Sequence, residues 1–337
     1  MGNPPKRFRK CGWSLKNRTI DTIEQSMNKM TLDLEVFQEP EGGRRPPEFI
    51  AVSKSTQTDL FQLSALLYKG KKPFFQSQNG ALFEGDCLEL LPLVKSNCID
   101  TVFADPPFNL DKKYGAKSKD NLPEQEYVAW CKAWLDECIR VLKPGGSLFL
   151  YNLPRWNIVL GAYLIEMGLT FRHDITVDVK STMPISGRLY PSHYSLLYFS
   201  KGKPKTFRKV RTPIEVCRHC GGDVKDYGGH RNAMNPLGVN LRDVWTDIPP
   251  VRHWKFKSKD RPANALSTKL LDRVVEISTV EGEIVLDPFG GSGTTFAVCE
   301  KKNRYWIGFE LDFAQQIKER LQDDEIAHHK NTDFVEG

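Results

Sequence analysis

The chain has 337 residues, 40% of them hydrophobic, and carries a formal net charge of +6. This is the composition of an ordinary globular protein with enough apolar material for a sizeable core. No apolar run approaches the ~18 residues of a transmembrane helix, so no membrane-spanning helix is expected. The eight cysteines lie mostly within apolar patterns, which predicts reduced thiols and a cytoplasmic location.

Residues 1–70 are polar and rich in turn-forming residues, and they predict an extension without a defined function. From Ala81 onward, apolar runs of strand length alternate with segments of helical period. Strands are expected at 81–86, 99–105, 147–152, 171–179, 193–200, 283–287 and 304–311. Helices are expected at 87–94, 124–143, 157–168 and 265–279, with a further helix beginning at Thr294. The alternation predicts an α/β fold with a mostly parallel sheet covered by helices on both faces.

The positive charge is concentrated between Lys201 and Arg261, a segment with 15 Lys and Arg but only 6 Asp and Glu. Because this excess is larger than the net charge of the whole chain, the remaining residues are net acidic. Aromatic residues are interleaved with the basic ones, among them Tyr227, Trp245, Trp254 and Phe256. This pattern predicts an insert that binds a polyanion such as nucleic acid.

The first candidate functional motif is Asp105-Pro106-Pro107-Phe108, which follows the buried strand expected at 99–105. Proline has a fixed φ and no N–H group, so the two prolines make this segment stiff. The segment presents one carboxylate, free main-chain carbonyls and one aromatic ring. A rigid turn without function is the alternative interpretation.

The second motif is the glycine-rich turn “VLDPFGGSGTT”, residues 285–295, after the strand that ends at Asp287. Glycines allow a tight turn and a close approach of the backbone to a ligand. The spacing matches neither the dinucleotide fingerprint nor the Walker loop. Glu310 lies some twenty residues further on, at the end of the next strand, where α/β folds place an acid that binds ribose hydroxyls.

The two motifs together resemble those of a known family. “DPFGGSGTT” (287–295) is similar to the S-adenosylmethionine loop, and “ADPPFNL” (104–110) to the catalytic loop, of amino-methylating DNA methyltransferases. The order of catalytic loop, basic insert and cofactor loop resembles the β-class enzymes, which modify adenine N6 or cytosine N4. The likeness runs from about Leu82 to Leu321. It includes “HDITVDVKSTMP” followed by His193, which is similar to a segment of cell-cycle-type adenine methyltransferases.

The resemblance implies a class I methyltransferase fold, a Rossmann-like, doubly wound and mostly parallel seven-stranded sheet with a target-recognition insert. The expected organisation is an extension at 1–70, a catalytic half at 71–200, the basic insert at 201–261, a cofactor-binding half at 262–321 and a tail at 322–337. The implied cofactor is S-adenosyl-L-methionine. The cofactor-binding residues that the resemblance implies are Asp86, Asp287, Phe289, Gly290, Gly291, Ser292, Gly293, Thr294 and Glu310.

Individual roles follow from matching positions in the family. Glu310 resembles the acid that binds the ribose hydroxyls, and Phe289 belongs to the turn around the methionine portion of the cofactor. Asp86 resembles the acid near the adenine ring, although its position also fits a helix N-cap. The segment “RPANALSTKL” (261–270) departs from the usual family pattern, so no contact is assigned to it.

The implied catalytic residues are Asp105, Pro106, Pro107 and Phe108. An exocyclic amino group is a poor nucleophile because its lone pair is delocalised into the base. The Asp105 carboxylate and the Pro106 carbonyl can each accept one amino hydrogen, which turns the lone pair towards the methyl group. Phe108 offers a face on which the base can stack. The base must be flipped out of the duplex to reach this site.

The implied partner is double-stranded DNA, and the resemblance also allows a homodimer and a cognate restriction endonuclease. Adenine N6 is favoured over cytosine N4, because the motif begins with Asp105 where N4 enzymes usually carry Ser. An RNA or protein methyltransferase and a non-catalytic DNA-binding module remain alternatives. The cysteines lack the Pro-Cys context of cytosine-C5 enzymes.

Cys217 and Cys220 form the one pair at metal-binding spacing, in “CRHCGG”. A structural zinc site requires four ligands, and His219, His230 and His253 are candidates for completing it. A turn with reduced thiols is the alternative, and the sequence does not decide between the two.

Overall fold

The computed structural model describes residues 71–112, 120–179, 186–187, 189–214, 216–217, 221–222, 229, 233–249 and 265–322. The expected extension at 1–70, the tail beyond Gln322 and residues 250–261 of the basic insert lie outside these ranges. None of the helices in the described part of the chain is long and apolar enough to cross a membrane.

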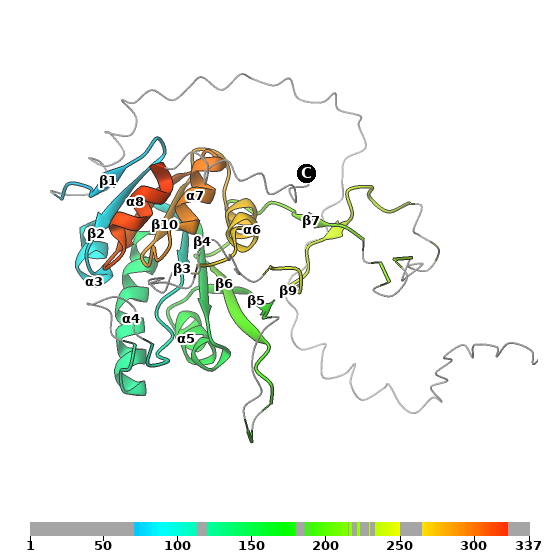
Figure 1. The fold of residues 1–337 in the computed structure, drawn as a ribbon, viewed down its shortest axis with the longest axis horizontal. Helices are drawn as coiled ribbons and strands as arrows, with labels where there is room; N and C mark the ends of the chain where they lie inside the picture. The colour runs from blue at the N-terminus through cyan, green and yellow to red at the C-terminus, as the bar shows by residue number, and fades with distance from the viewer. Residues whose placement is uncertain are drawn as a thin grey trace, which may run out of the picture. The chain divides into compact units, whose positions relative to one another are not determined.

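The described residues form one large mixed sheet (Figure 1). Its strand order is β1 (Phe75–Gln76), β2 (Gly80–Glu84), β11 (Tyr305–Glu310), β10 (Ile284–Asp287), β3 (Ile99–Ala104), β4 (Leu142–Asn152), β6 (His193–Ser200), β5 (Thr170–Asp178) and β9 (Val244–Trp245). Strands β2, β11, β10, β3 and β4 run parallel, and β6 is antiparallel to both of its neighbours. The seven expected strands and the mostly parallel sheet are therefore confirmed.

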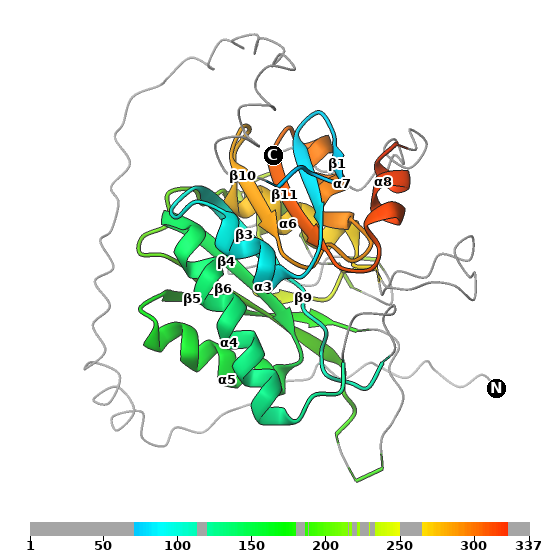
Figure 2. The same cartoon turned by 90° about the vertical axis from the view of Figure 1, so that its left-hand side faces the viewer.

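Helices cover both faces of the sheet, as Figures 1 and 2 show. One hydrophobic cluster contains buried residues of α3 (Cys87–Leu90), η1 (Leu91–Leu93), α4 (Glu124–Val141) and α5 (Pro154–Glu166). The other cluster contains buried residues of α6 (Thr268–Ser278), α7 (Thr294–Lys301) and α8 (Ala314–Gln322). Each helix contributes an apolar stripe, so the sheet is enclosed as the alternating sequence pattern predicts.

The structure differs from the expected elements at their ends. Strands β1 and β9 have only two residues each, too few for an alternating pattern in the sequence. The helix expected to end at Lys143 ends at Val141, because Leu142 is extended and pairs with Ile99 of β3. Helix α5 begins earlier than expected, with Pro154 in its first turn, where a missing N–H group costs nothing.

Part of the basic insert belongs to the core. The ammonium group of Lys201 donates to the carbonyls of Ile139 and Leu142, each at 2.8 Å, at the C-terminal end of α4. Arg208 forms an ion pair with Glu276 at 2.7 Å. These cations have partners within the fold, so the charge excess of the sequence overstates the charge available to a polyanion.

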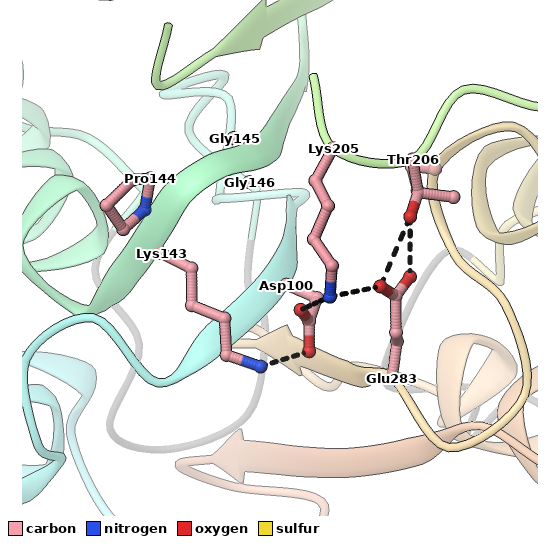
Figure 3. A pocket seen from close by; sticks show the side chains of 9 residues that line it. Asp100, Lys143, Pro144, Gly145, Gly146, Lys205, Thr206 and Glu283 are labelled. Atoms are coloured by element: carbon pink, nitrogen blue, oxygen red, sulfur yellow. Dashed lines mark hydrogen bonds and ion pairs between the residues drawn. The ribbon is translucent and has the colours of Figure 1, made fainter. Parts of the chain in front are cut away.

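Figure 3 shows a small polar pocket where the insert leaves the sheet. Lys205 lies 3.1 Å from Glu283, whose carboxylate also accepts a hydrogen bond from Thr206 at 3.1 Å. Lys143 lies 2.7 Å from Asp100, a buried acid that also accepts from the main-chain N–H of Ile284 at 3.0 Å. The two buried carboxylates and their cations tie residues 205–206 to the sheet. The short strands β7 (Arg211–Thr212) and β8 (Val239–Asn240) then pair outside it.

Gly308 of β11 provides a test of the packing on the face that α7 covers. A Cβ atom at this position would lie 2.2 Å from Cζ of Phe296, whose ring stacks on Trp306. We expect Gly308→Ala to lower the free energy of unfolding by about 1–3 kcal/mol, measured by urea denaturation, because the core is overpacked. The double variant Gly308→Ala/Phe296→Leu should recover part of the loss.

Gly161→Ala is the control, since its Cβ would meet only the flexible end of Leu197 at 3.1 Å. It should leave stability nearly unchanged. Wild-type stability in Gly308→Ala would show that Phe296 does not pack against this strand.

Candidate active site

Four acidic residues lie at one edge of the sheet. Asp287 and Glu310 end the neighbouring parallel strands β10 and β11, Asp105 follows β3, and Asp86 follows β2. Because adjacent parallel strands end on the same side, residues separated by some 200 positions meet here. The negative charge of Asp287 acts on Asp105, and that of Glu310 acts on Asp287. The catalytic and cofactor motifs of the sequence therefore share one site.

Asp105 is half-buried and lacks a hydrogen-bond donor among the described residues. Burial of the carboxylate, reinforced by the charge of Asp287, raises the pKa of Asp105 well above its usual value. A carboxylate in this setting has all its lone pairs available to a ligand. It is a strong hydrogen-bond acceptor and can also hold a proton.

The carbonyl groups that follow Asp105 are held unequally. The Tyr127 hydroxyl donates to the Pro107 carbonyl at 2.7 Å, and Trp156 Nε1 donates to the Phe108 carbonyl at 2.9 Å. Within the ranges that the structure describes, no donor bonds to the Pro106 carbonyl. The loop therefore presents two open acceptors side by side, the Asp105 carboxylate and the Pro106 carbonyl.

The next turn of the chain is fixed by Asn109 and Asp120. The Asp120 carboxylate accepts from the main-chain N–H groups of Asn109, Leu110 and Lys112 at 2.6, 3.1 and 3.0 Å. The Asn109 amide nitrogen donates to the Leu122 carbonyl, and the Asn109 side-chain oxygen accepts from the Leu122 N–H, each at 2.7 Å. Asn109 has a φ of +57°, a conformation that asparagine tolerates better than most residues. Sequence reasoning missed these two residues, although an Asn directly after the motif was a usable signal.

Aromatic rings surround the open acceptors. The Phe108 ring lies 5.5 Å from that of Tyr194 and 6.0 Å from that of Tyr151. Burial, with a contribution from the charge of Asp105, raises the pKa of Tyr194. His193, which follows the segment that is similar to cell-cycle-type adenine methyltransferases, is exposed at the start of β6.

Asp287 organises the glycine-rich turn. One carboxylate oxygen accepts from the N–H of Phe289 at 2.9 Å, and the other from the Thr295 hydroxyl at 2.6 Å. Asp287 is buried, and this burial raises its pKa to about 7 in spite of the two hydrogen bonds. The phenyl ring of Phe289 is anchored against Trp134 of α4, with ring centroids 5.0 Å apart.

Two glycines of the turn have the positive φ that other residues adopt at a cost. Gly293, with a φ of +75°, is the N-cap of α7 and lies against Ile317. Gly291 has a φ of +52°, and a Cβ there would meet only the Phe289 carbonyl, at 3.8 Å. The space beside Gly291 is therefore open to a ligand that approaches the backbone. Arg320 of α8 supports the turn from behind, donating to the Ser292 carbonyl at 2.6 Å and to the Thr294 hydroxyl at 3.1 Å.

Glu310 connects the ends of β10 and β11. One oxygen accepts from the N–H of Gly291 at 2.6 Å, and the other from the N–H groups of Leu311, Asp312 and Phe313 at 3.0 to 3.2 Å. The oxygen facing Gly291 accepts a single one of these bonds and retains capacity for a second donor. A ribose hydroxyl at Glu310 fits this arrangement and stays a prediction.

Asp86 caps helix α3, with its carboxylate accepting from the N–H of Leu88 at 2.8 Å. The N-cap interpretation is confirmed, and contact with the adenine ring of a cofactor stays a prediction. Of the suggested zinc ligands only Cys217 is described. Across the described ranges, no three His, Cys, Asp or Glu side chains are grouped as a metal site.

Comparison with known proteins agrees with this geometry. The family model of the N6/N4 DNA methylases matches residues 99–319, more than half of the chain. The chain belongs to this family of amino-methylating DNA methyltransferases, whose methyl donor is S-adenosylmethionine. The open space at Gly291, the remaining acceptor capacity of the Glu310 oxygen that faces Gly291, and the anchored ring of Phe289 fit such a cofactor.

Individual relatives cover most of the described fold. The chain is 58% identical over 252 residues to the type II methyltransferase M.BamHI of Bacillus amyloliquefaciens, a match covering 74% of this chain but only 59% of that protein. It is 31% identical over 243 residues to the type II methyltransferase M.HpaI of Haemophilus parainfluenzae, covering 70% and 72%. The structure of the PvuII DNA methyltransferase (cytosine-N4-specific) matches with a TM-score of 0.53 and 25% identity, covering 74% of this chain and 89% of that one.

The raised pKa of Asp287 predicts how stability depends on pH. In the unfolded chain Asp287 titrates near 3.8, and in the folded protein near 7. Between these values the folded state retains a proton that the unfolded state has released, so stability falls as pH rises, by about 1.4 kcal/mol per pH unit. Above a pH of about 7 both states have released this proton. The contribution of Asp287 to the free energy of unfolding is then lost, and stability no longer depends on its titration.

Asp287→Asn removes this titration while one side-chain oxygen remains to accept from Phe289. We expect the stability advantage of the wild type over the variant to shrink from pH 4 to pH 7, measured by chemical denaturation at each pH. Glu310 titrates in both proteins, so its contribution largely cancels in the difference. An advantage that grows with pH over this window would contradict the burial of an uncompensated charge at Asp287.

Proposed function

We propose that the protein transfers a methyl group from S-adenosylmethionine to the exocyclic amino group of a base in a specific sequence of double-stranded DNA. The observation that carries the proposal is the pair of open acceptors, the Asp105 carboxylate and the Pro106 carbonyl, beside the glycine-rich turn. Family membership supports the reaction class. Activity, substrate and partners are proposed here because the chain spans less than two thirds of the length of M.BamHI.

The two acceptors suit the chemistry of an aromatic amine. Its nitrogen lone pair is delocalised into the base, and an acceptor on each N–H turns the nitrogen towards a tetrahedral geometry. Positive charge then develops on the nitrogen, close to the half-buried carboxylate of Asp105. Acceptors fixed before the reaction stabilise this charge without a cost of reorganisation. The raised pKa of Asp105 suits it to take the proton that the nitrogen releases.

The cofactor would lie along the turn after β10. S-adenosylmethionine supplies the methyl group on a positively charged sulfur, which leaves as a neutral thioether. Gly291 allows its close approach to the backbone, Glu310 would hold the ribose, and Phe289 borders the methionine portion. Holding the acceptor nitrogen and the methyl group in line gives the proximity contribution to catalysis.

A base inside a duplex does not reach Asp105, so the target base must be flipped out at a cost of a few kcal/mol. The Phe108 ring offers a stacking surface beside the acceptors, worth about 1–3 kcal/mol per base. Phosphate contacts from the basic insert would contribute further. Lys255, Lys257 and Lys259 of the basic insert lie outside the described residues. A homodimer and a cognate restriction endonuclease stay predictions.

Two bases compete as the substrate. Adenine N6 is favoured by Asp105 at the first position of the motif, where N4 enzymes usually carry Ser. Cytosine N4 is favoured by the likeness to the PvuII enzyme, which is cytosine-N4-specific. The two-acceptor clamp serves either amino group. Nucleoside analysis of methylated DNA by mass spectrometry separates N6-methyladenine from N4-methylcytosine.

The test of the proposed function is the variant Asp105→Ala. We expect transfer of labelled methyl groups to DNA to fall by more than about a hundredfold, because the carboxylate acceptor is lost. The Kd for S-adenosylmethionine, measured by calorimetry, should stay within about threefold, since the cofactor is held by the other loop. RNA and protein substrates are assayed in parallel with the wild type.

Two results would overturn this proposal. One is transfer by the wild type to RNA or protein but not to DNA. The other is a loss of cofactor affinity in Asp105→Ala that matches the loss of activity, which would contradict separate roles for the two loops.

A further inference from the structure

Tyr127 and Asn152 form a buried pair behind the catalytic loop. Tyr127 is on α4, Asn152 ends β4, and their side chains are 2% and 0% exposed. The Asn152 amide nitrogen donates to the Tyr127 hydroxyl at 3.0 Å, and that hydroxyl donates to the Pro107 carbonyl at 2.7 Å. Neither residue carries a signal in the sequence that separates it from the core.

The direction of this chain of bonds is determined by its far end. The Asn152 side-chain oxygen accepts from the N–H of Leu153 at 2.7 Å, so its amide nitrogen is the group that faces Tyr127. An amide nitrogen only donates, and the Tyr127 oxygen must therefore accept from it. The single hydroxyl proton of Tyr127 is then directed at the Pro107 carbonyl. Burial raises the pKa of Tyr127, which keeps that proton in place.

The held carbonyl restricts the two acceptors in front of it. Strand β3 fixes the chain before Asp105, and Tyr127 fixes it again at Pro107. The proline rings set φ at both intervening positions. Little freedom is left for the Pro106 carbonyl, whose aim depends on the Pro107 peptide staying where it is.

The same helix also contacts the cofactor loop. Trp130 and Trp134 of α4 pack on Phe289, with ring centroids 5.7 and 5.0 Å apart. Tyr127 lies one turn before Trp130, and their rings are 5.9 Å apart. Helix α4 thus touches the loop that holds the acceptor amine and the loop that would hold the methyl donor.

We infer that Tyr127 is a positioning residue, oriented by Asn152, that fixes the Pro107 carbonyl and so aims the Asp105 and Pro106 acceptors at the amino group. This inference rests on the proposed function and adds to it residues outside both motifs. Tyr127 touches neither the base nor the cofactor. Its effect is on the alignment of the acceptor nitrogen with the methyl group.

The test is Tyr127→Phe, which removes one oxygen and keeps the ring. We expect the single-turnover rate of methyl transfer to fall about tenfold to a hundredfold, as misplacement of reacting groups does. The Kd values for S-adenosylmethionine and DNA should stay within about twofold, and so should the fluorescence change of 2-aminopurine at the target position, which reports flipping. The matched control is Tyr198→Phe, since among the described residues that hydroxyl has only a 3.4 Å contact with Ser147.

Asn152→Asp is the second variant, and it keeps the acceptor for Leu153. A carboxylate there takes the Tyr127 proton away from Pro107, so the rate should fall as in Tyr127→Phe. The double variant should be no slower than either single one, because both break the same bond.

Three outcomes are distinguishable. A wild type that methylates no DNA overturns the proposed function itself. An active wild type whose Tyr127→Phe variant matches Tyr198→Phe overturns the positioning role. Equal losses of rate and of both affinities in Tyr127→Phe would show a general structural role, and would also overturn it.

Discussion

The parallel pairing of β3 with β10 is the interaction on which the site depends. Leu286 pairs with Val102, so Asp287 and Asp105 are delivered to the same edge within electrostatic reach of each other. Between these two strands the chain forms β4, β5, β6 and β9, all on the far side of β3 from β10, before it returns to β10. The proposed site therefore needs two loops that are far apart in the sequence. Helix α4 then contacts both loops, through Tyr127 and through Trp130 and Trp134. The register of two strands and the packing of one helix therefore set the spacing between the two loops, and with it the distance that a methyl group would move in the proposed reaction.

The sequence predicted the parts of the structure that have a local pattern. Strands and helices of the core followed from apolar period, and the two motifs followed from residue types at strand ends. Edge strands of two residues, such as β9, have no period to detect. The bracing by Tyr127, Trp156 and Asp120 was also beyond prediction, because each acts on residues 8 to 48 positions away and reads as ordinary core or loop.

The charge of the insert shows a different limit of sequence reasoning. A count of basic residues treats every cation as available, whereas desolvation and pairing decide which ones are. Lys201 caps carbonyls at the end of α4, and Lys205 and Arg208 pair with acids of the core. These contacts attach the insert to the sheet and lower the field that DNA would experience from it. The contacts that each cation makes in the fold, and not the composition, decide whether that cation is available to bind DNA.

The acids of the site differ in how fully the fold satisfies their oxygens. Asp287 and Glu310 are both buried, and each has both oxygens occupied by main-chain or hydroxyl donors of the loops they organise. Asp105 is only half-buried by solvent exposure; it shares the raised pKa but has no donor in the described part of the chain. A buried acceptor without a partner costs stability, and a fold retains it where a ligand completes the bonding. Tyr127 satisfies the Pro107 carbonyl one residue beyond Pro106, whereas the described residues supply no donor to the Asp105 carboxylate or the Pro106 carbonyl, the two groups that an amino substrate would occupy in the proposed function.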